Sequence, residues 1–464
     1  MNFENLKSVY FIGIGGIGMS AIARYFHAHG KEVAGYDKTP TPLTDELILE
    51  GIEVHFEDNP DAVNNRKLEI ENCLVVYTPA VPKDHKELNY FLRNGFTVLK
   101  RSQVLGLITQ NHFTIAVAGT HGKTTTSSMI AHILRSSGIN CTAFLGGISK
   151  NYNTNLLLPA EPSKPSVVVV EADEYDRSFL TLHPDIAVIT SMDADHLDIY
   201  GDKNYMEDSY RLFAQQVKEK GVLISRIGLP VGKTKSTQKQ YSLSDPADYT
   251  ASGIEIKNHQ YYFNWVSNNC SIENLATQMP GRHNVENVVA AIAVAKEIAI
   301  ADEKIYTAVH SYAGVRRRFD YQVKTDSLVF IDDYAHHPEE LRACISSVRE
   351  LYPDKKITGI FQPHLFTRTR DFADGFAKSL SLLDELILLD IYPARELPIP
   401  GVTSELILGK VSIPNKTLCR KADVMGNLNA KKIEVLLTLG AGDIDQLVEP
   451  IKKLLIQGSK NPEK

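Results

Sequence analysis

The stretch Gly-Thr-His-Gly-Lys-Thr-Thr-Thr at residues 119–126 directly follows the apolar run Phe113 to Ala118. An apolar strand, a glycine turn and a helix start, in this order, form a cradle for a triphosphate. Backbone N–H groups face the anion, Lys123 adds a positive charge, and the hydroxyl of Thr124 reaches a phosphate-bound Mg²⁺. The spacing is shorter than a full Walker A signature, which needs a glycine where this chain has Val117. We predict that ATP binds at Gly119, Thr120, His121, Gly122, Lys123, Thr124 and Thr125.

A second glycine turn opens the chain. A short apolar strand at residues 8–12 runs into Gly-Ile-Gly-Gly-Ile-Gly at 13–18, then a helix to about His29 and a strand from Glu32 to Tyr36. This pattern predicts a Rossmann-like unit whose turn binds a diphosphate, with an acid after the second strand accepting a ribose hydroxyl. Taken alone it favours a nicotinamide cofactor, but the second, triphosphate-type loop favours a nucleotide-sugar. The predicted substrate contacts are Gly15, Gly16, Ile17, Gly18, Asp37 and Thr78.

Length and composition describe a globular α/β protein of several domains. The 464 residues predict about three domains, and strands alternate with helices throughout, which is typical of mostly parallel sheets. We place the domains at 1–108 (Rossmann-like), 109–313 (a central P-loop ATPase) and 314–464 (Rossmann-like). The net charge of −6 offers no basic field for nucleic acid. No apolar run reaches membrane-span length, no targeting segment is visible, and the five cysteines are scattered, so we expect a cytoplasmic protein with reduced thiols.

Acidic residues follow two further apolar strands. The run Val167 to Val170 ends in Glu171, and the strand 186–190 is followed by Asp193 and His196. Carboxylates at the carboxyl ends of strands beside a phosphate loop are typical Mg²⁺ ligands. We predict that Thr124, Glu171 and His196 are metal ligands, for two Mg²⁺ ions or for one with shared ligands. The alternative for Glu171 and His196 is a solvated acidic loop.

Three clusters nearer the C-terminus carry further polar side chains. Residues 281–287 begin an Ala-rich helix, for which Asn284 is a plausible cap, and His283 and Asn287 can hydrogen-bond a base. Three arginines at 316–318 form a solvated linker or place one guanidinium on a phosphate. Two strand ends, at 332–338 and 361–370, carry histidines, acids and arginines, which together suit a carboxylate substrate.

In this order, the motifs resemble those of the Mur ligases of peptidoglycan synthesis over nearly the whole chain. The resemblance rests on residues 13–20, 119–126, 171–174, 195–196, 281–284, 317–319, 333–338, 364–369 and 440–443. It implies three domains, for a UDP-sugar, for ATP and, at the C-terminus, for the amino acid, with the last closing over ATP. The implied substrates are UDP-N-acetylmuramate, L-alanine and ATP, with Mg²⁺, in a monomer or weak homodimer without nucleic-acid or membrane partners.

The resemblance also implies roles for single residues. His283, Asn284 and Asn287 would meet adenine, Asp333 the ribose and Arg317 the phosphates. The L-alanine would be surrounded by Tyr334, His336, His364 and Arg368. The predicted catalytic residues are Lys123, His336, His364 and Arg368. Where family members usually carry Arg-Tyr, this chain has Leu365 and Phe366.

The implied reaction is ATP-dependent ligation of L-alanine to the lactyl carboxylate of the UDP-sugar through an acyl phosphate. Three alternatives stay open at this point. One is a recycling ligase that adds a ready-made tripeptide to the same UDP-sugar. The others are a nicotinamide-dependent oxidoreductase and a nucleotide-binding module without catalytic activity.

Overall fold

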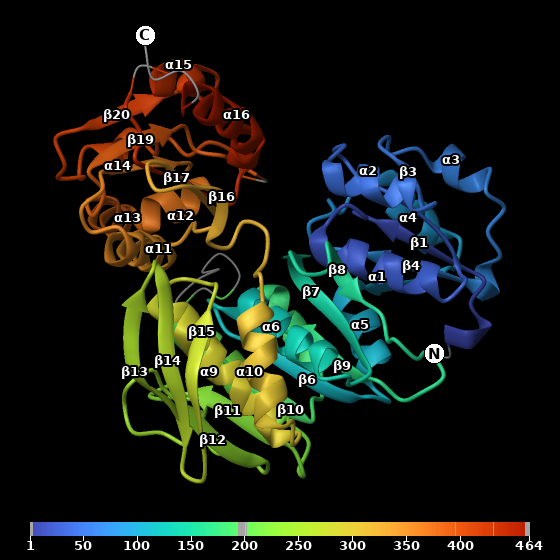
Figure 1. Cartoon of the computed structure of the whole chain (residues 1–464). Coiled ribbons are helices and arrows are strands. Elements are labelled where there is room, and N and C mark those ends of the chain that lie inside the picture. The colour runs from blue at the N-terminus through green and yellow to red at the C-terminus, as the bar shows by residue number, and fades with distance from the viewer. Residues whose placement is uncertain (1–2, 194–199, 201, 395, 430, 460–464) are drawn as a thin grey trace. The chain divides into compact units, whose positions relative to one another are not determined.

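Three β-sheets, each with its own helices, follow one another along the chain (Figure 1). The computed structural model describes residues 3–193, 200, 202–394, 396–429 and 431–459. The chain divides into two compact units. The first unit comprises residues 1–251, 265–272 and 287–312, and the second comprises residues 252–264, 273–286 and 313–464.

The first sheet is parallel throughout, with the strand order β3-β2-β1-β4-β5. Every residue of β1 is buried, as expected for the central strand of a sheet covered on both faces. The strand order reverses at β1, and the glycine turn at 13–18 follows this strand, where α/β sheets bind ligands. The elements are β1 Ser8–Ile12, α1 Ile17–Ala28, β2 Glu32–Tyr36, α2 Pro42–Leu49, β3 Glu53–His55, α3 Pro60–Asn64, β4 Cys73–Tyr77, α4 Lys86–Arg93, β5 Thr97–Lys100 and α5 Arg101–Thr109.

The second sheet has the order β15-β14-β13-β12-β11-β10-β6-β9-β7-β8. Strand β6 pairs in parallel with β9 and β10, so their carboxyl ends meet at one edge, and β7 and β8 form an antiparallel pair. The strands are β6 Phe113–Ala118, β7 Cys141–Ser149, β8 Thr154–Leu157, β9 Val167–Glu171, β10 Ile186–Ile189, β11 Val222–Arg226, β12 Thr237–Tyr241, β13 Tyr249–Lys257, β14 Gln260–Ser267 and β15 Ser271–Thr277. The helices are α6 Lys123–Ser136, η3 Tyr175–Thr181, α8 Lys203–Gln215, α9 Arg282–Glu297 and α10 Asp302–Ser311.

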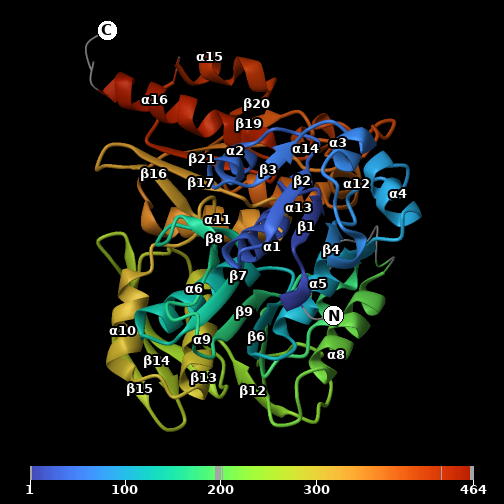
Figure 2. The same cartoon turned by 90° about the vertical axis from the view of Figure 1, so that its right-hand side faces the viewer.

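The third sheet has the order β16-β17-β21-β18-β19-β20, and only its edge strand β16 runs antiparallel to its neighbour. Figures 1 and 2 place α15 and α16 on one face and α11 and α13 on the other. The elements are β16 Asp320–Lys324, β17 Val329–Asp333, α11 Pro338–Leu351, β18 Ile357–Phe361, α12 Phe366–Asp371, α13 Ala373–Leu380, β19 Glu385–Leu389, α14 Glu405–Leu408, β20 Lys416–Cys419, α15 Val424–Asn429, β21 Val435–Leu439 and α16 Val448–Ser459.

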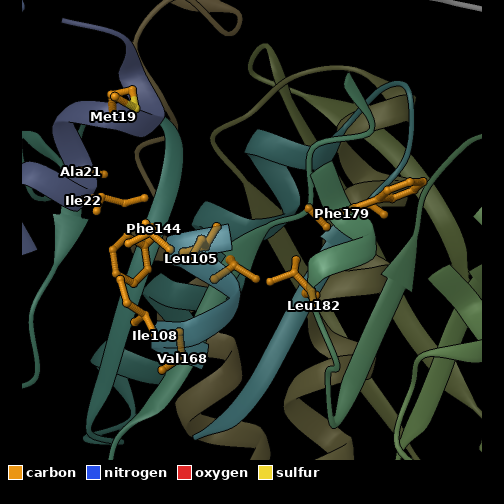
Figure 3. Close-up of a cluster of buried hydrophobic side chains, with 14 of the residues drawn as sticks. Met19, Ala21, Ile22, Leu105, Ile108, Phe144, Val168, Phe179 and Leu182 are labelled. Atoms are coloured by element: carbon orange, nitrogen blue, oxygen red, sulfur yellow. The ribbon is translucent and has the colours of Figure 1, made fainter. Parts of the chain in front are cut away.

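One apolar core joins the first sheet's helices to the second sheet within the first unit (Figure 3). Ile22 of α1 lies beside Phe144 of β7, and Leu105 of α5 continues the cluster toward Leu182. Each fully buried side chain of this size contributes about 1.5–3 kcal/mol. The two glycine turns therefore sit on one packed body.

The described residues contain no helix that is both long and apolar enough to cross a bilayer. All five cysteines are free thiols, and four of them are buried.

Candidate functional site

Both glycines of the phosphate loop are required by its backbone. Gly119 has φ +135° and Gly122 has φ +81°, which L side chains rarely adopt. A Cβ at Gly119 would also lie 2.0 Å from Oγ1 of Thr190, and one at Gly122 would lie 2.6 Å from Oδ1 of Asn287. The loop is pinned to the end of β10, because the His121 N–H donates to Oγ of Ser191 at 2.8 Å. In this conformation the His121 N–H is therefore already hydrogen-bonded within the protein.

Lys123 begins α6 and points back over the loop. Its Nζ donates to the Gly119 carbonyl at 2.6 Å and lies 2.8 Å from Oε2 of Glu174, a carboxylate that is itself buried. Burial opposes the charge on Lys123, but Glu174, Glu171 and Asp173 outweigh that effect and raise the pKa of the ammonium. The lysine therefore stays charged in the protein interior, which the predicted phosphate contact requires.

Glu171 ends β9, which lies next to β6 in the sheet. Its Oε2 is buried with no hydrogen-bond partner among the residues that the structure describes, and a Cβ at Gly146 would lie 2.1 Å from that oxygen. A buried carboxylate oxygen left without a donor fits a bound cation. Thr124 lies in the first turn of α6, and His196 lies outside the described residues. Within the described part of the chain, no three His, Cys, Asp or Glu side chains converge on one point.

The predicted adenine contacts come from both compact units. Asn287, in the first unit, lies beside the phosphate loop, with Oδ1 3.3 Å from Oγ1 of Thr126. In the second unit, burial lowers the pKa of His283 to about 4, so its ring is neutral. The cap reading of Asn284 is wrong: α9 already begins at Arg282, and the Asn284 amide donates to the Pro280 carbonyl at 2.6 Å.

A cavity of about 820 Å³ lies next to the first glycine turn, within the first unit. Gly15 donates its N–H to Oδ2 of Asp37 at 2.7 Å, and Thr39 donates to Oδ1 at 3.2 Å, so the carboxylate is held at the cavity wall. Glu171 and Asp173 line the same cavity. All the contacts predicted for the nucleotide-sugar line it: Gly15, Gly16, Ile17, Gly18, Asp37 and Thr78.

In the second unit, the four predicted amino-acid contacts form one chain of neighbours. The ring centroids of Tyr334 and His336 are 5.2 Å apart, and those of His336 and His364 are 6.0 Å apart. Nη1 of Arg368 lies 3.3 Å from Nδ1 of His364. The 3.2 Å contact between Nδ1 of His336 and Oε2 of Glu340 fixes that ring. Four side chains from two segments of the sequence, 332–338 and 361–370, thus lie close together.

Arg317 and Asp333 both adjoin Tyr334: the Tyr334 N–H donates to the Arg317 carbonyl at 2.7 Å, and Asp333 is the preceding residue. The guanidinium of Arg317 lies 5.0 Å from the ring centroid of Tyr334, and its Nη2 donates to the Gly440 carbonyl at 2.7 Å. Asp333 accepts the N–H groups of Phe319 and Ala335, each at 2.7 Å. Burial raises the pKa of Asp333 to about 6, although Arg318 and the two N–H groups oppose that shift.

Three family models match consecutive parts of the chain. They are described as the Mur ligase family catalytic domain at residues 8–113, the Mur ligase middle domain at 117–295 and the Mur ligase glutamate ligase domain at 317–443. The chain belongs to the Mur ligase family. The predicted three-domain α/β fold is thereby confirmed, whereas the boundaries that we placed at 108 and 313 stay predictions.

Two curated relatives that match over nearly their full length carry the same name. The chain is 51% identical to the UDP-N-acetylmuramate–L-alanine ligase of Parabacteroides distasonis, over all of both chains. It is 52% identical to the ligase of the same name from Porphyromonas gingivalis, over 97% of this chain and 99% of the relative. The crystal structure of UDP-N-acetylmuramate-alanine ligase from Thermotoga maritima matches with a TM-score of 0.82 at 26% identity, over 97% and 99% of the two chains. A murein peptide ligase from Psychrobacter arcticus shares the fold, with a TM-score of 0.71 at 21% identity over 97% and 98% of the two chains.

Sequence reasoning missed several residues of this Mur ligase that adjoin the predicted ones. Glu174 holds Lys123, and Tyr392 stacks on His364 with ring centroids 5.7 Å apart. Arg101 lines the cavity beside Gly18. Glu174 lay within a segment already identified as acidic, but nothing in the sequence pointed to Arg101, because it belongs to no motif and begins an ordinary helix.

Proposed function

We propose that this Mur ligase joins L-alanine to the lactyl carboxylate of UDP-N-acetylmuramate, with ATP as co-substrate, in the synthesis of peptidoglycan precursors. The observation that carries the proposal is the cavity that the diphosphate turn at residues 15–18 shares with Glu171. Glu171 ends the strand next to the one that leads into the phosphate loop. A nucleotide-sugar whose diphosphate is bound at the turn would therefore extend its lactyl carboxylate toward the ATP phosphates. The full-length relatives of the same name support this assignment.

In the first step, an oxygen of the lactyl carboxylate attacks the γ-phosphorus of ATP, and the bond to the β,γ-bridging oxygen breaks. The products are an acyl phosphate and ADP. Lys123 stabilises the charge on the transferring phosphoryl group, because its own positive charge is maintained by Glu174. Mg²⁺ would be held by Thr124 and Glu171, with His196 as the third predicted ligand, and would neutralise phosphate charge when bound.

In the second step, the amine of L-alanine attacks the acyl carbon and phosphate leaves. The amine must be neutral, and with a pKa near 8 roughly a tenth of an α-amino group is neutral at pH 7. A weak base is therefore sufficient, and we assign that role to His336 or His364. Arg368, whose Nη1 lies 3.3 Å from Nδ1 of His364, would bind the amino-acid carboxylate through charge-assisted hydrogen bonds.

The experiment is phosphate release from ATP in the presence of UDP-N-acetylmuramate, with L-alanine, with the tripeptide L-Ala-D-Glu-diaminopimelate, or without an acceptor. We expect release with L-alanine only. Release with the tripeptide only would assign the chain to the recycling reaction. Absence of release in all three reactions would favour a module that binds nucleotides without turnover.

A further inference from the structure

Arg101 is a largely buried cation at the wall of the cavity. It is the first residue of α5, and its side chain is 18% exposed. Its Nη2 donates to Oδ2 of Asp173 at 2.8 Å. Of the described residues that line the cavity, Lys38, Lys86 and Arg101 carry a permanent positive charge, and both lysines are exposed. Arg101 is therefore the cation that the fold itself fixes at this cavity.

Gly18 leaves the space that the guanidinium of Arg101 occupies. A Cβ at Gly18 would lie 2.7 Å from Nη1 and 3.3 Å from Cδ and Cζ of Arg101. The φ of Gly18 is not positive, so its backbone does not itself require glycine. Because Gly18 has no side chain, the side chain of Arg101 fits against the first turn of α1.

The guanidinium of Arg101 lies between Gly18 of the glycine turn and Asp173, and both of these residues line the same cavity. One side of the guanidinium faces Gly18, in the first turn of α1, and the other contacts Asp173, two residues after Glu171. A guanidinium has five N–H donors, so the bond to Asp173 leaves donors for a second acid. An anionic substrate group that approaches Glu171 and Asp173 would be repelled unless a cation were already there.

We propose that Arg101 binds the lactyl carboxylate of the UDP-sugar and distinguishes it from the same nucleotide-sugar without the lactyl group. Arginine and carboxylate form paired, charge-assisted hydrogen bonds, which suit orientation as well as binding. The salt bridge with Asp173 holds the guanidinium in position before the substrate arrives. This inference rests on the proposed function, because it takes UDP-N-acetylmuramate as the substrate.

The test compares the dissociation constants of UDP-N-acetylmuramate and UDP-N-acetylglucosamine by calorimetry in the absence of ATP. These two ligands share the nucleotide, the diphosphate and the sugar, and differ in the lactyl group. For Arg101→Gln we expect the first ligand to bind about 10- to 100-fold more weakly and the second to bind nearly unchanged. Lys100→Gln is the matched control, because Lys100 is the preceding residue and pairs with Asp176 instead.

Equal weakening of both ligands would place Arg101 on the diphosphate or in the packing of the turn, and would overturn the inference. So would unchanged binding of both. Arg101→Lys keeps the charge and should retain part of the discrimination, and this variant is decisive if Arg101→Gln does not fold, as judged by thermal unfolding. Ligation of L-alanine by the wild type tests the proposed function separately from these affinities.

Discussion

The two glycine turns of the first unit look alike in sequence but need their glycines for different reasons. In the phosphate loop, Gly119 and Gly122 have positive φ angles, so the backbone itself excludes other residues. In the diphosphate turn, Gly13 also has a positive φ of +88°, but Gly15 and Gly18 have ordinary φ angles, and a Cβ there would meet side chains from distant segments, Asp37 and Arg101. Backbone conformation thus acts on both glycines of the phosphate loop, whereas Gly15 and Gly18 are required by space alone.

The helices that follow the two turns are also anchored differently. In α1, Arg24 forms ion pairs with Glu46 and Glu50 and donates to Oδ1 of Asn155 at 2.5 Å. Asn155, on β8, donates in turn to the Ile17 carbonyl at 2.6 Å, in the first turn of α1. In α6, the anchor is His132, a buried ring that contacts the hydroxyls of Tyr152 and Ser311. The diphosphate helix is thus fixed by charges and the phosphate helix by a neutral histidine.

The largest expected effect tests whether the two turns have separate functions, one in ligation and one in binding the UDP-sugar. Lys123→Ala removes the charge next to the transferring phosphate, and we expect ligation to fall by at least about 100-fold. The affinity for UDP-N-acetylmuramate should stay the same, because Lys123 is not among the residues that line the cavity. Phosphate release and calorimetry measure the two quantities. A near-wild-type rate would refute the assigned role of Lys123.

Gly122→Ala tests whether conformation controls the phosphate loop. An alanine at φ +81° is strained by roughly 1–2 kcal/mol and would also press on Asn287, so we expect ATP affinity to fall by roughly 10-fold or more. Gly138→Ala is the matched control, because Gly138 has φ +78° and open space around its Cα. It should lower thermal stability without changing the affinity for ATP. Equal losses of ATP affinity in Gly122→Ala and Gly138→Ala would contradict the view that the backbone conformation at Gly122 controls ATP binding.

Gly15→Ala tests whether space controls the diphosphate turn. A Cβ at Gly15 would lie 2.8 Å from Thr44 and 2.9 Å from Asp37, whereas a Cβ at Gly16 would have no neighbour closer than 3.6 Å. We expect Gly15→Ala to weaken binding of the UDP-sugar by roughly 10-fold and Gly16→Ala to change it less, because displacing Asp37 costs about 1–2 kcal/mol. Calorimetry measures the affinity of both variants for the UDP-sugar. A larger loss in Gly16→Ala than in Gly15→Ala would contradict the steric argument.

A further test concerns the anchor of α6, and it affects stability rather than ligand affinity. Burial lowers the pKa of His132 from 6.5 to about 4, so its imidazole binds a proton less readily in the folded protein than in the unfolded chain. Stability contributed by the neutral ring is complete above pH 6.5 and is lost as the pH falls toward 4, by on the order of 2–3 kcal/mol. His132→Gln keeps hydrogen-bonding capacity and should flatten the dependence of unfolding free energy on pH in this range. Identical pH profiles for variant and wild type would contradict this account.

Local patterns were sufficient for much of the fold. The strands at 8–12, 32–36 and 113–118 lie where the sequence predicted them, because a buried parallel strand is recognisable as a short, mostly apolar run. Asn284 was misread because a polar residue in the first turn of a helix looks like a cap in the sequence. The antiparallel strand β16 was not foreseen, because pairing direction depends on where the chain returns.

The sequence by itself determined both glycine turns, the family, and the candidate residues at strand ends, since these depend on short-range order along the chain. Only the tertiary structure decided that Arg101 stands against Gly18, that Glu174 holds Lys123, and that one cavity includes both residues 15–18 and Glu171. These contacts join residues that are 51 to 156 positions apart, such as Lys123 and Glu174 or Gly15 and Glu171. No local pattern encodes them, because they arise when separate sheets and helices pack into one core.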